Sequence, residues 1–293
     1  MPAGHRRPAN WNLIRMLLKL LKSWTGARDD RIDNRDVEYP EERVARLKRA
    51  YERAPTDLHR DILYRSLSIS GRPLNRLVDQ SLADSKVKMD RLKALHRPLA
   101  SFFLIQYFHY ASELEGAQAE CGVFGGTSAL LLCRSAQIQI PDYRGAGLHL
   151  IDSFEGLSAP SVQDVFPVRR NSDVAVAGHS WAKGEFFAPI DRARNALKDF
   201  PDVTFHAGWI PEILAELPDT RWSFVHLDVD LYAPTLASLA YFYPRLSAGG
   251  VIICDDYGAP LFPGAHRAWD DYCEEHDLPY VVLDTGQSVI VKT

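Results

Sequence analysis

Cysteine is scarce in this chain: Cys121, Cys133, Cys254 and Cys273 are the four cysteines among 293 residues. No two of them have CxxC spacing, so the pattern indicates neither a zinc knuckle nor a disulfide framework. Stability must then come from a hydrophobic core, and a hydrophobic content of 46% is sufficient to build one. We expect one or two domains and a reducing, cytoplasmic location.

Long apolar runs and excess positive charge are also missing. No run approaches the roughly 20 apolar residues that a transmembrane helix needs. The net charge of -4 gives no overall positive field for nucleic acid. We therefore expect neither a transmembrane segment nor a nucleic-acid partner.

The amino-terminal end is the one basic region. Residues 1–28 contain six Lys or Arg residues and no acid, around the Leu-rich stretch "NLIRMLLKLLKSW". Basic residues interrupt the apolar run, which favours an amphipathic helix over a cleaved signal peptide. Such a helix packs on its own domain or on a second subunit of a homo-oligomer; contact with a membrane surface is the alternative.

The pattern of apolar and charged residues changes near residue 95. Residues 1–95 show charged, helical periodicity, as in Val44, Leu47 and Tyr51. Residues 96–293 instead alternate short apolar runs with stretches long enough for helices, which predicts an α/β domain with a mostly parallel sheet. The last two runs are separated by a short Gly-containing turn and predict an antiparallel hairpin. The runs are "AECGVF", "LHLID", "VTFHA", "FVHLDVD", "VIICDD", "YVVLD" and "SVIVK".

Glycine follows the first run, in "ECGVFGGTSALLL". Its glycines allow a tight turn and close approach of a ligand to the backbone, and we expect Thr127 and Ser128 to cap the next helix. Phe124 stands where a dinucleotide fingerprint has its second glycine, so the turn suits another small ligand, or it is purely structural. The glycines are Gly122, Gly125 and Gly126.

Acids follow the later runs. In an open parallel sheet, ligands bind beyond the carboxyl ends of the strands. Asp152, in "LIDSFEGL", is placed to receive a ribose diol, although an acid capping a surface turn would look the same.

Two pairs of acids end the fourth and fifth apolar runs. Asp228 and Asp230 end "FVHLDVD", and we expect them to share one face of an extended strand. Asp255 and Asp256 end the following run, so neighbouring strands would gather four carboxylates at one edge. Oxygen ligands of this kind favour a hard cation, Mg²⁺ before Ca²⁺ or Mn²⁺. His226 is either an added nitrogen ligand or, more simply, a core histidine.

Several blocks in a fixed order give a resemblance over about residues 116–275. The blocks "ECGVFGG", "IDSFEGL", "HAGWIPEIL", "LDVDLYAPT", "LSAGGVIICDDYG" and "PGAHRAWDDY" resemble the macrocin-type (TylF-like) O-methyltransferases, which use S-adenosylmethionine and Mg²⁺. The resemblance implies a Rossmann-like class I methyltransferase sheet of seven strands, and we expect residues 96–293 to form this methyltransferase domain. It does not extend to residues 1–95, whose helical periodicity predicts an amino-terminal extension that serves as a lid or in oligomerisation.

The same resemblance implies roles for individual residues. Asp228, Asp255 and Asp256 would bind Mg²⁺, and Asp230 would be the general base, with a histidine as the open alternative. The residues implied to hold S-adenosylmethionine are Glu120, Gly122, Val123, Phe124, Gly125, Thr127, Ser128, Asp152, Ser153, Phe154, Gly208 and Trp209. The chain departs from the family near Gly125, where a bulkier, basic residue is usual, and at Val229, where glycine is usual.

The implied reaction is methyl transfer to a hydroxyl of a small-molecule acceptor in secondary metabolism. The acceptor is a glycoside or saccharide, and a phenolic diol is the alternative. The segment 165–189 is long and mixes aromatic with charged residues, which predicts a cap over the acceptor. Its candidate contacts are Arg169, Arg170, His179, Trp181 and Lys183. His266 is a further candidate for acceptor contact or for the base.

Three other functions fit parts of the pattern. A haloacid-dehalogenase-like phosphatase also combines DxD with a later DD pair, but no lysine occurs between Asp230 and Asp255, as that chemistry requires. A DxD glycosyltransferase leaves the glycine turn and the terminal hairpin unexplained. A non-catalytic binding module would not need both the turn and the paired acids.

Overall fold

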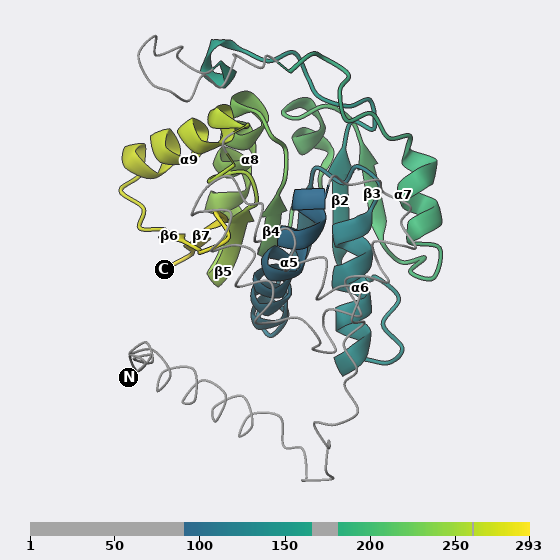
Figure 1. The fold of residues 1–293 in the computed structure, drawn as a ribbon. Helices are drawn as coiled ribbons and strands as arrows, with labels where there is room; N and C mark the ends of the chain where they lie inside the picture. Colours follow the sequence, from purple (N-terminus) through teal and green to yellow (C-terminus); the bar gives the residue numbers. More distant parts are fainter. Residues whose placement is uncertain (1–90, 166–180, 260) are drawn as a thin grey trace, which may run out of the picture. The chain divides into compact units, whose positions relative to one another are not determined.

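The computed structural model describes residues 91–165, 181–259 and 261–293 (Figure 1). The predicted helical extension therefore lies almost wholly outside the described residues, as do Arg169, Arg170 and His179. The first described element, α5 (Arg91–Ser112), spans the proposed boundary at residue 95, and the division into two parts remains a prediction. Within the described residues, no helix is both long and apolar enough to cross a membrane.

Seven strands form one sheet in the order β3-β2-β1-β4-β5-β7-β6. The first five strands in the chain pair in parallel, and β7 runs antiparallel to both β5 and β6. The predicted parallel sheet with a terminal hairpin is confirmed. The strands are β1 (Ala117–Cys121), β2 (Leu148–Asp152), β3 (Thr204–Ala207), β4 (Trp222–Leu227), β5 (Leu246–Cys254), β6 (Val281–Val282) and β7 (Ser288–Val291).

Helices cover both faces of the sheet. The longer ones besides α5 are α6 (Thr127–Gln139), α7 (Ile190–Ala196), α8 (Tyr232–Phe242) and α9 (Pro263–Glu275); the 3₁₀ turns are η1 (Val162–Asp164), η2 (Glu212–Glu216) and η3 (Tyr243–Arg245). On one face α8, α9 and η2 pack against the sheet, and on the other α5, α6 and α7 do so. In Figure 1, α5 and α6 lie side by side in front of the strands.

Strand β4 shows why this sequence forms a central strand. All six of its residues are buried, as expected for a parallel strand that is covered on both faces. Val225 and Leu227 face the α8 and α9 side, and Phe224 faces α5, where its ring meets that of Phe108 edge to face at 5.5 Å. Burying each such side chain contributes about 1.5–3 kcal/mol.

The strand order places a topological switch between β1 and β4. From β1 the chain adds β2 and β3 on one side, and β4 and β5 lie on the other. A crevice forms beyond the carboxyl ends of the strands at such a point. The glycine turn after β1 and the acids after β4 both border it.

Candidate active site

The glycine turn and the first acid of the DxD pair are in direct backbone contact. Gly122 has φ 87°, and a Cβ at this position would overlap the carbonyl oxygen of Asp228. The Asp228 N–H donates to the Cys121 carbonyl at 2.9 Å, which continues the β1–β4 ladder by one residue. A side chain at residue 122 would therefore separate the two loops, and only glycine allows their approach.

Asp152 holds this turn together from the end of β2. Its Oδ2 accepts the N–H groups of Val123 at 2.7 Å and Phe124 at 2.9 Å, and its Oδ1 accepts the Phe154 N–H at 2.7 Å. Phe124 and Phe154 both have positive φ, 49° and 55°. Aromatic residues rarely adopt this conformation, so one carboxylate restrains two strained residues.

The helix after the turn begins differently from our expectation. Gly126, with φ 77°, is the N-cap residue of α6, and as a glycine it has no side chain to cap the helix. The prediction that Thr127 and Ser128 cap α6 is wrong, because both already lie within the helix. Gly125 and Ser128 are buried beside the turn, so the loop is a tight backbone cradle.

The end of β3 joins the same edge of the sheet. The Gly208 N–H donates to the Asp152 carbonyl at 2.9 Å, and Trp209 follows with the ammonium group of Lys183 5.6 Å from its ring centroid. Ser153 is used within its own turn, where its hydroxyl donates to the Gly156 carbonyl at 3.1 Å. The residues implied to bind cofactor after β1, β2 and β3 therefore form one continuous rim, with Glu120 below it.

The acids after β4 and β5 converge. One carboxylate oxygen from each of Asp228, Asp230 and Asp256 lies within 4.8 Å of the others. A ring nitrogen of His226 and one carboxylate oxygen from each of Asp228 and Asp255 also lie within 4.8 Å of one another. Asp228 belongs to both groups. The four acids therefore meet around one residue, although they come from two strand ends that are 25 residues or more apart in sequence.

A turn, rather than strand alternation, brings Asp230 to this cluster. Strand β4 ends at Leu227, so the expectation that Asp228 and Asp230 share one face of an extended strand is wrong. Asp230 has φ 64°, and the Leu231 N–H closes a tight turn around it by donating to the Val229 carbonyl at 2.6 Å. The Asp230 N–H donates to Asp256 Oδ2 at 2.9 Å, which holds the turn against the second acid pair.

The electrostatics of the cluster favour a bound cation. Burial, followed by the charge of Asp228, raises the pKa of the Asp256 carboxyl well above its usual range. The donors are hard carboxylate oxygens, and a cation between them would offset their repulsion. The residues present thus fit a divalent ion such as Mg²⁺.

A buried histidine lies directly beneath the acids. His226 is fully buried, with Nδ1 3.0 Å from Glu120 Oε1 and Nε2 3.1 Å from Asp255 Oδ1. Burial alone lowers its pKa, but the carboxylates of Asp255 and Glu120 together raise it well above the usual value. His226 therefore lies in the core, and its ring also belongs to one of the two sets of side chains that could hold a metal ion, so its role as a nitrogen ligand stays a prediction. Glu120 is only 1% exposed, so its side chain faces this histidine in the interior.

His266 is occupied by protein partners. Its Nδ1 lies 2.9 Å from the Tyr257 carbonyl oxygen and its Nε2 lies 3.1 Å from Asp270 Oδ2. Both ring nitrogens of His266 therefore already contact acceptor oxygens of the protein.

The residue before the predicted cap segment 165–189 and a described residue within it both contact the rest of the domain. Asp164 Oδ1 accepts the N–H of Tyr232, the first residue of α8, at 2.8 Å. Within the segment, the Trp181 ring stacks on Phe262 at 5.3 Å, and its Nε1 donates to the Leu261 carbonyl at 2.9 Å. Residues 166–180 lie outside the described part, so the cap itself remains a prediction.

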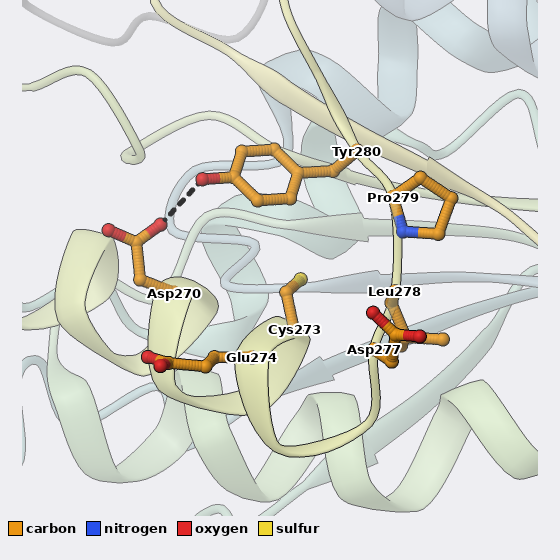
Figure 2. A pocket seen from close by; sticks show the side chains of 7 residues that line it. All are labelled: Asp270, Cys273, Glu274, Asp277, Leu278, Pro279 and Tyr280. Carbon is orange, nitrogen blue, oxygen red and sulfur yellow. Dashed lines mark hydrogen bonds between the residues drawn. The ribbon is translucent and has the colours of Figure 1, made fainter.

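A separate hollow of about 670 Å³ lies at the end of α9 (Figure 2). Tyr280 points toward Asp270 there and donates a hydrogen bond to Oδ1 at 2.9 Å. Asp270, Glu274 and Asp277 make the hollow acidic. Neither of the two convergent sets of metal ligands in the described residues includes them, so the candidate site is the strand-end cluster.

Comparison with known proteins identifies the family. The model of the family described as macrocin O-methyltransferase (TylF) matches residues 79–288. The chain belongs to the macrocin O-methyltransferase family. The resemblance seen in the sequence is thereby confirmed over a longer stretch than the motifs alone covered.

Curated relatives match this chain over part of their length. Mycinamicin III 3''-O-methyltransferase of Micromonospora griseorubida is 28% identical over 172 residues, 58% of this chain and 65% of that enzyme. The 8-demethyl-8-(2,3-dimethoxy-alpha-L-rhamnosyl)-tetracenomycin-C 4'-O-methyltransferase of Streptomyces olivaceus is 30% identical over 152 residues, 50% of this chain and 55% of that enzyme. The chain spans less than two thirds of the length of these relatives.

Solved structures show the same fold. The O-methyltransferase NovP superposes with a TM-score of 0.56 at 19% identity, covering 75% of this chain and 98% of NovP. The calicheamicin methyltransferase CalS11 gives 0.54 at 18% identity, covering 74% and 91% of the two chains. The class I methyltransferase fold that the sequence predicted is confirmed.

Proposed function

We propose that this chain is an S-adenosylmethionine- and divalent-cation-dependent O-methyltransferase that acts on a sugar hydroxyl of a natural-product glycoside. The observation that carries the proposal is the junction of the glycine turn with the acidic cluster at the β1/β4 switch point, seen in the contact of Gly122 with Asp228. Two relatives are named as O-methyltransferases of mycinamicin III and of a rhamnosyl-tetracenomycin, and the second name specifies a sugar group. These names support the sugar acceptor.

The rim formed by the ends of β1, β2 and β3 suits the cofactor. We assign the turn at residues 122–126 to the amino-acid portion, Asp152 to the ribose hydroxyls and Trp209 to the adenine side. Asp152 Oδ1 accepts a single backbone N–H, so it retains capacity for a ribose hydroxyl. We assign Glu120 to supporting the cofactor rim from the interior of the sheet, because its side chain is buried against His226.

We assign cation binding and proton removal to the acidic cluster. Asp228, Asp255 and Asp256 would hold the cation. When bound, S-adenosylmethionine supplies an electrophilic methyl group and the cation supplies the charge that makes an acceptor hydroxyl more acidic. Asp230 then takes the hydroxyl proton on a carboxylate oxygen while the new O–C bond forms and the S–C bond breaks.

The geometry favours Asp230 over either histidine as the base. His226 is fully buried, so no acceptor reaches it, and both nitrogens of His266 face acceptor oxygens. Asp230 stands at the tip of a tight turn and is partly exposed. The positive φ at this residue fixes its carboxylate beside Asp228 and Asp256, where orientation contributes to the rate.

The alternatives weighed from the sequence receive no support. A phosphatase or glycosyltransferase shares the acids but not the family match over residues 79–288. The methyltransferase proposal accounts for the glycine turn, the acids and the terminal hairpin together.

Calorimetric titration tests the proposal. We expect S-adenosylmethionine to bind and NADH to give no heat, each measured with and without Mg²⁺. An acceptor screen would follow, comparing deoxysugar glycosides, free nucleotide sugars and a catechol, with S-adenosylhomocysteine formation as the readout. We expect turnover with a glycoside and its loss in EDTA. Failure to bind S-adenosylmethionine would overturn the proposed function. Turnover that is unaffected by EDTA would refute the proposed dependence on a divalent cation.

A further inference from the structure

A buried line of polar side chains runs across the sheet beneath the acids. Glu120 on β1 and His226 on β4 are paired in the parallel register, and Asp255 follows β5, the next strand. The line continues to Gln287, the residue before β7, whose Nε2 donates to Asp255 Oδ1 at 2.6 Å. Gln287 is 1% exposed and lies 32 residues beyond Asp255 in the sequence.

Thr285 fixes the orientation of the Gln287 amide. The Thr285 hydroxyl donates to Gln287 Oε1 at 2.7 Å, in a site where both residues are buried. If the amide were flipped, its oxygen would face the Asp255 carboxylate and two acceptors would meet without a hydrogen. Only one orientation satisfies both contacts, and it points the NH₂ group at Asp255.

Asp255 Oδ1 therefore has two buried polar neighbours. Gln287 Nε2 donates a hydrogen bond to it at 2.6 Å, whereas His226 Nε2 lies 3.1 Å away as an ion-pair contact without hydrogen-bond geometry, so Gln287 supplies the hydrogen bond that restrains rotation of the carboxylate. The restraint fixes the orientation of the Asp255 carboxylate beside His226 and Asp228 in the cluster. Partners that orient a ligating carboxylate typically change metal affinity about 10- to 100-fold when they are removed.

We propose that Gln287 is a positioning residue that orients the Asp255 carboxylate for divalent-cation binding, with Thr285 holding Gln287 in place. The proposal rests on the proposed function, in which Asp255 is a cation ligand. It extends the site to the carboxy-terminal hairpin, which contributes no acid of its own to the cluster. The antiparallel β5–β7 pairing, Cys254 opposite Ser288, brings residue 287 beside residue 255.

Mn²⁺ binding to the full-length chain tests this role. We would measure Mn²⁺ affinity by electron paramagnetic resonance, and S-adenosylhomocysteine affinity by calorimetry in EDTA. Gln287→Leu keeps the side-chain size and removes the donor, so we expect Mn²⁺ to bind at least about 10-fold more weakly, with cofactor affinity unchanged within about twofold. Thr285→Val should weaken Mn²⁺ binding in the same direction by a smaller factor.

Ser288→Ala is the matched control. Ser288 is also fully buried, adjoins Gln287 and has a hydroxyl without a hydrogen-bond partner among the described residues. We expect Mn²⁺ affinity to be unchanged in this variant. Should Gln287→Leu not fold, Gln287→Asn retains a polar amide that is too short to reach Asp255, and the same loss of affinity is expected.

The outcomes separate this inference from the proposed function. If the wild-type chain binds Mn²⁺, Asp228→Asn abolishes binding and the Gln287 variants bind as tightly as wild type, Gln287 has only a structural role and the inference is overturned. The proposed function then stands. If the wild-type chain binds no Mn²⁺ at all, the cation dependence itself fails, and the inference fails with it.

Discussion

Replacing Asp230 by asparagine tests the assignment of the base. Asparagine has nearly the same size and adopts positive φ more readily than most residues, so it suits the φ of 64° at this position. The backbone N–H that donates to Asp256 Oδ2 is unaffected by the change. We therefore expect the turn to keep its shape while the proton acceptor is lost.

The loss of a general base typically lowers the rate by about 100- to 10,000-fold. This corresponds to about 3–5 kcal/mol of transition-state stabilisation, at about 1.4 kcal/mol for each factor of ten. The effect belongs in kcat, because Asp230 is assigned neither to the cofactor nor to the cation. We expect the affinity for S-adenosylmethionine to change less than about twofold.

The same substitution should also lower the charge repulsion within the acidic cluster. Asp228, Asp230 and Asp256 have carboxylate oxygens within 4.8 Å of one another. Two unit charges at that distance repel by about 3 kcal/mol at an effective dielectric constant of about 20. Removing one of them should leave the Tm of the cation-free chain unchanged or higher, so a loss of activity could not be attributed to unfolding.

The assay would follow S-adenosylhomocysteine formation at saturating cofactor, alongside Tm and Mn²⁺ affinity. Asp271→Asn is the control, because it removes an exposed carboxylate that contacts the Tyr232 hydroxyl rather than the cluster. Retention of kcat within about threefold in Asp230→Asn would refute the base assignment. A parallel loss of cofactor affinity, or a fall in Tm, would indicate a structural role instead.

Two further predictions concern the scaffold. Gly122→Ala should lower the free energy of unfolding by at least about 2 kcal/mol in urea denaturation, because its Cβ would overlap the Asp228 carbonyl. Gly147 has a similar φ of 83° but lies in open space, so Gly147→Ala should cost clearly less. Equal losses in the two variants would contradict the argument from contact. Burial lowers the pKa of both His149 and His206, whose ring nitrogens lie 2.9 Å apart, so the unfolded chain binds protons more readily and stability should fall as the pH drops below about 6.5. His206→Gln should flatten this dependence between pH 7.5 and 5.5, and an unchanged slope would exclude the pair as its source.

The strand positions could be read from the sequence because they follow from local patterning. Each apolar run is short, and the intervals between runs are long enough for helices, which indicates a parallel sheet. The residues that end each run could likewise be named, since ligands bind at carboxyl ends of parallel strands. The glycine turn, Asp152 and both acid pairs were found in this way.

The detailed geometry of those residues depended on long-range structure. Strand alternation predicted one face for Asp228 and Asp230, yet β4 ends at Leu227 and a turn at Asp230 sets the side chains. The position of Asp152 predicted a contact with ribose. It did not predict the hydrogen bonds that Asp152 accepts from Val123 and Phe124, which follow a neighbouring strand. Such contacts have no periodic signal in the sequence.

The sequence by itself determined the class of the fold, the order of its elements and the chemistry available at each strand end. Only the tertiary structure decided which side chains share a site. Glu120 pairs with His226 across 106 residues, and Gln287 reaches Asp255 across 32 residues. Both contacts require a specific register between strands, and that register is set by packing of the whole sheet rather than by any local run of residues.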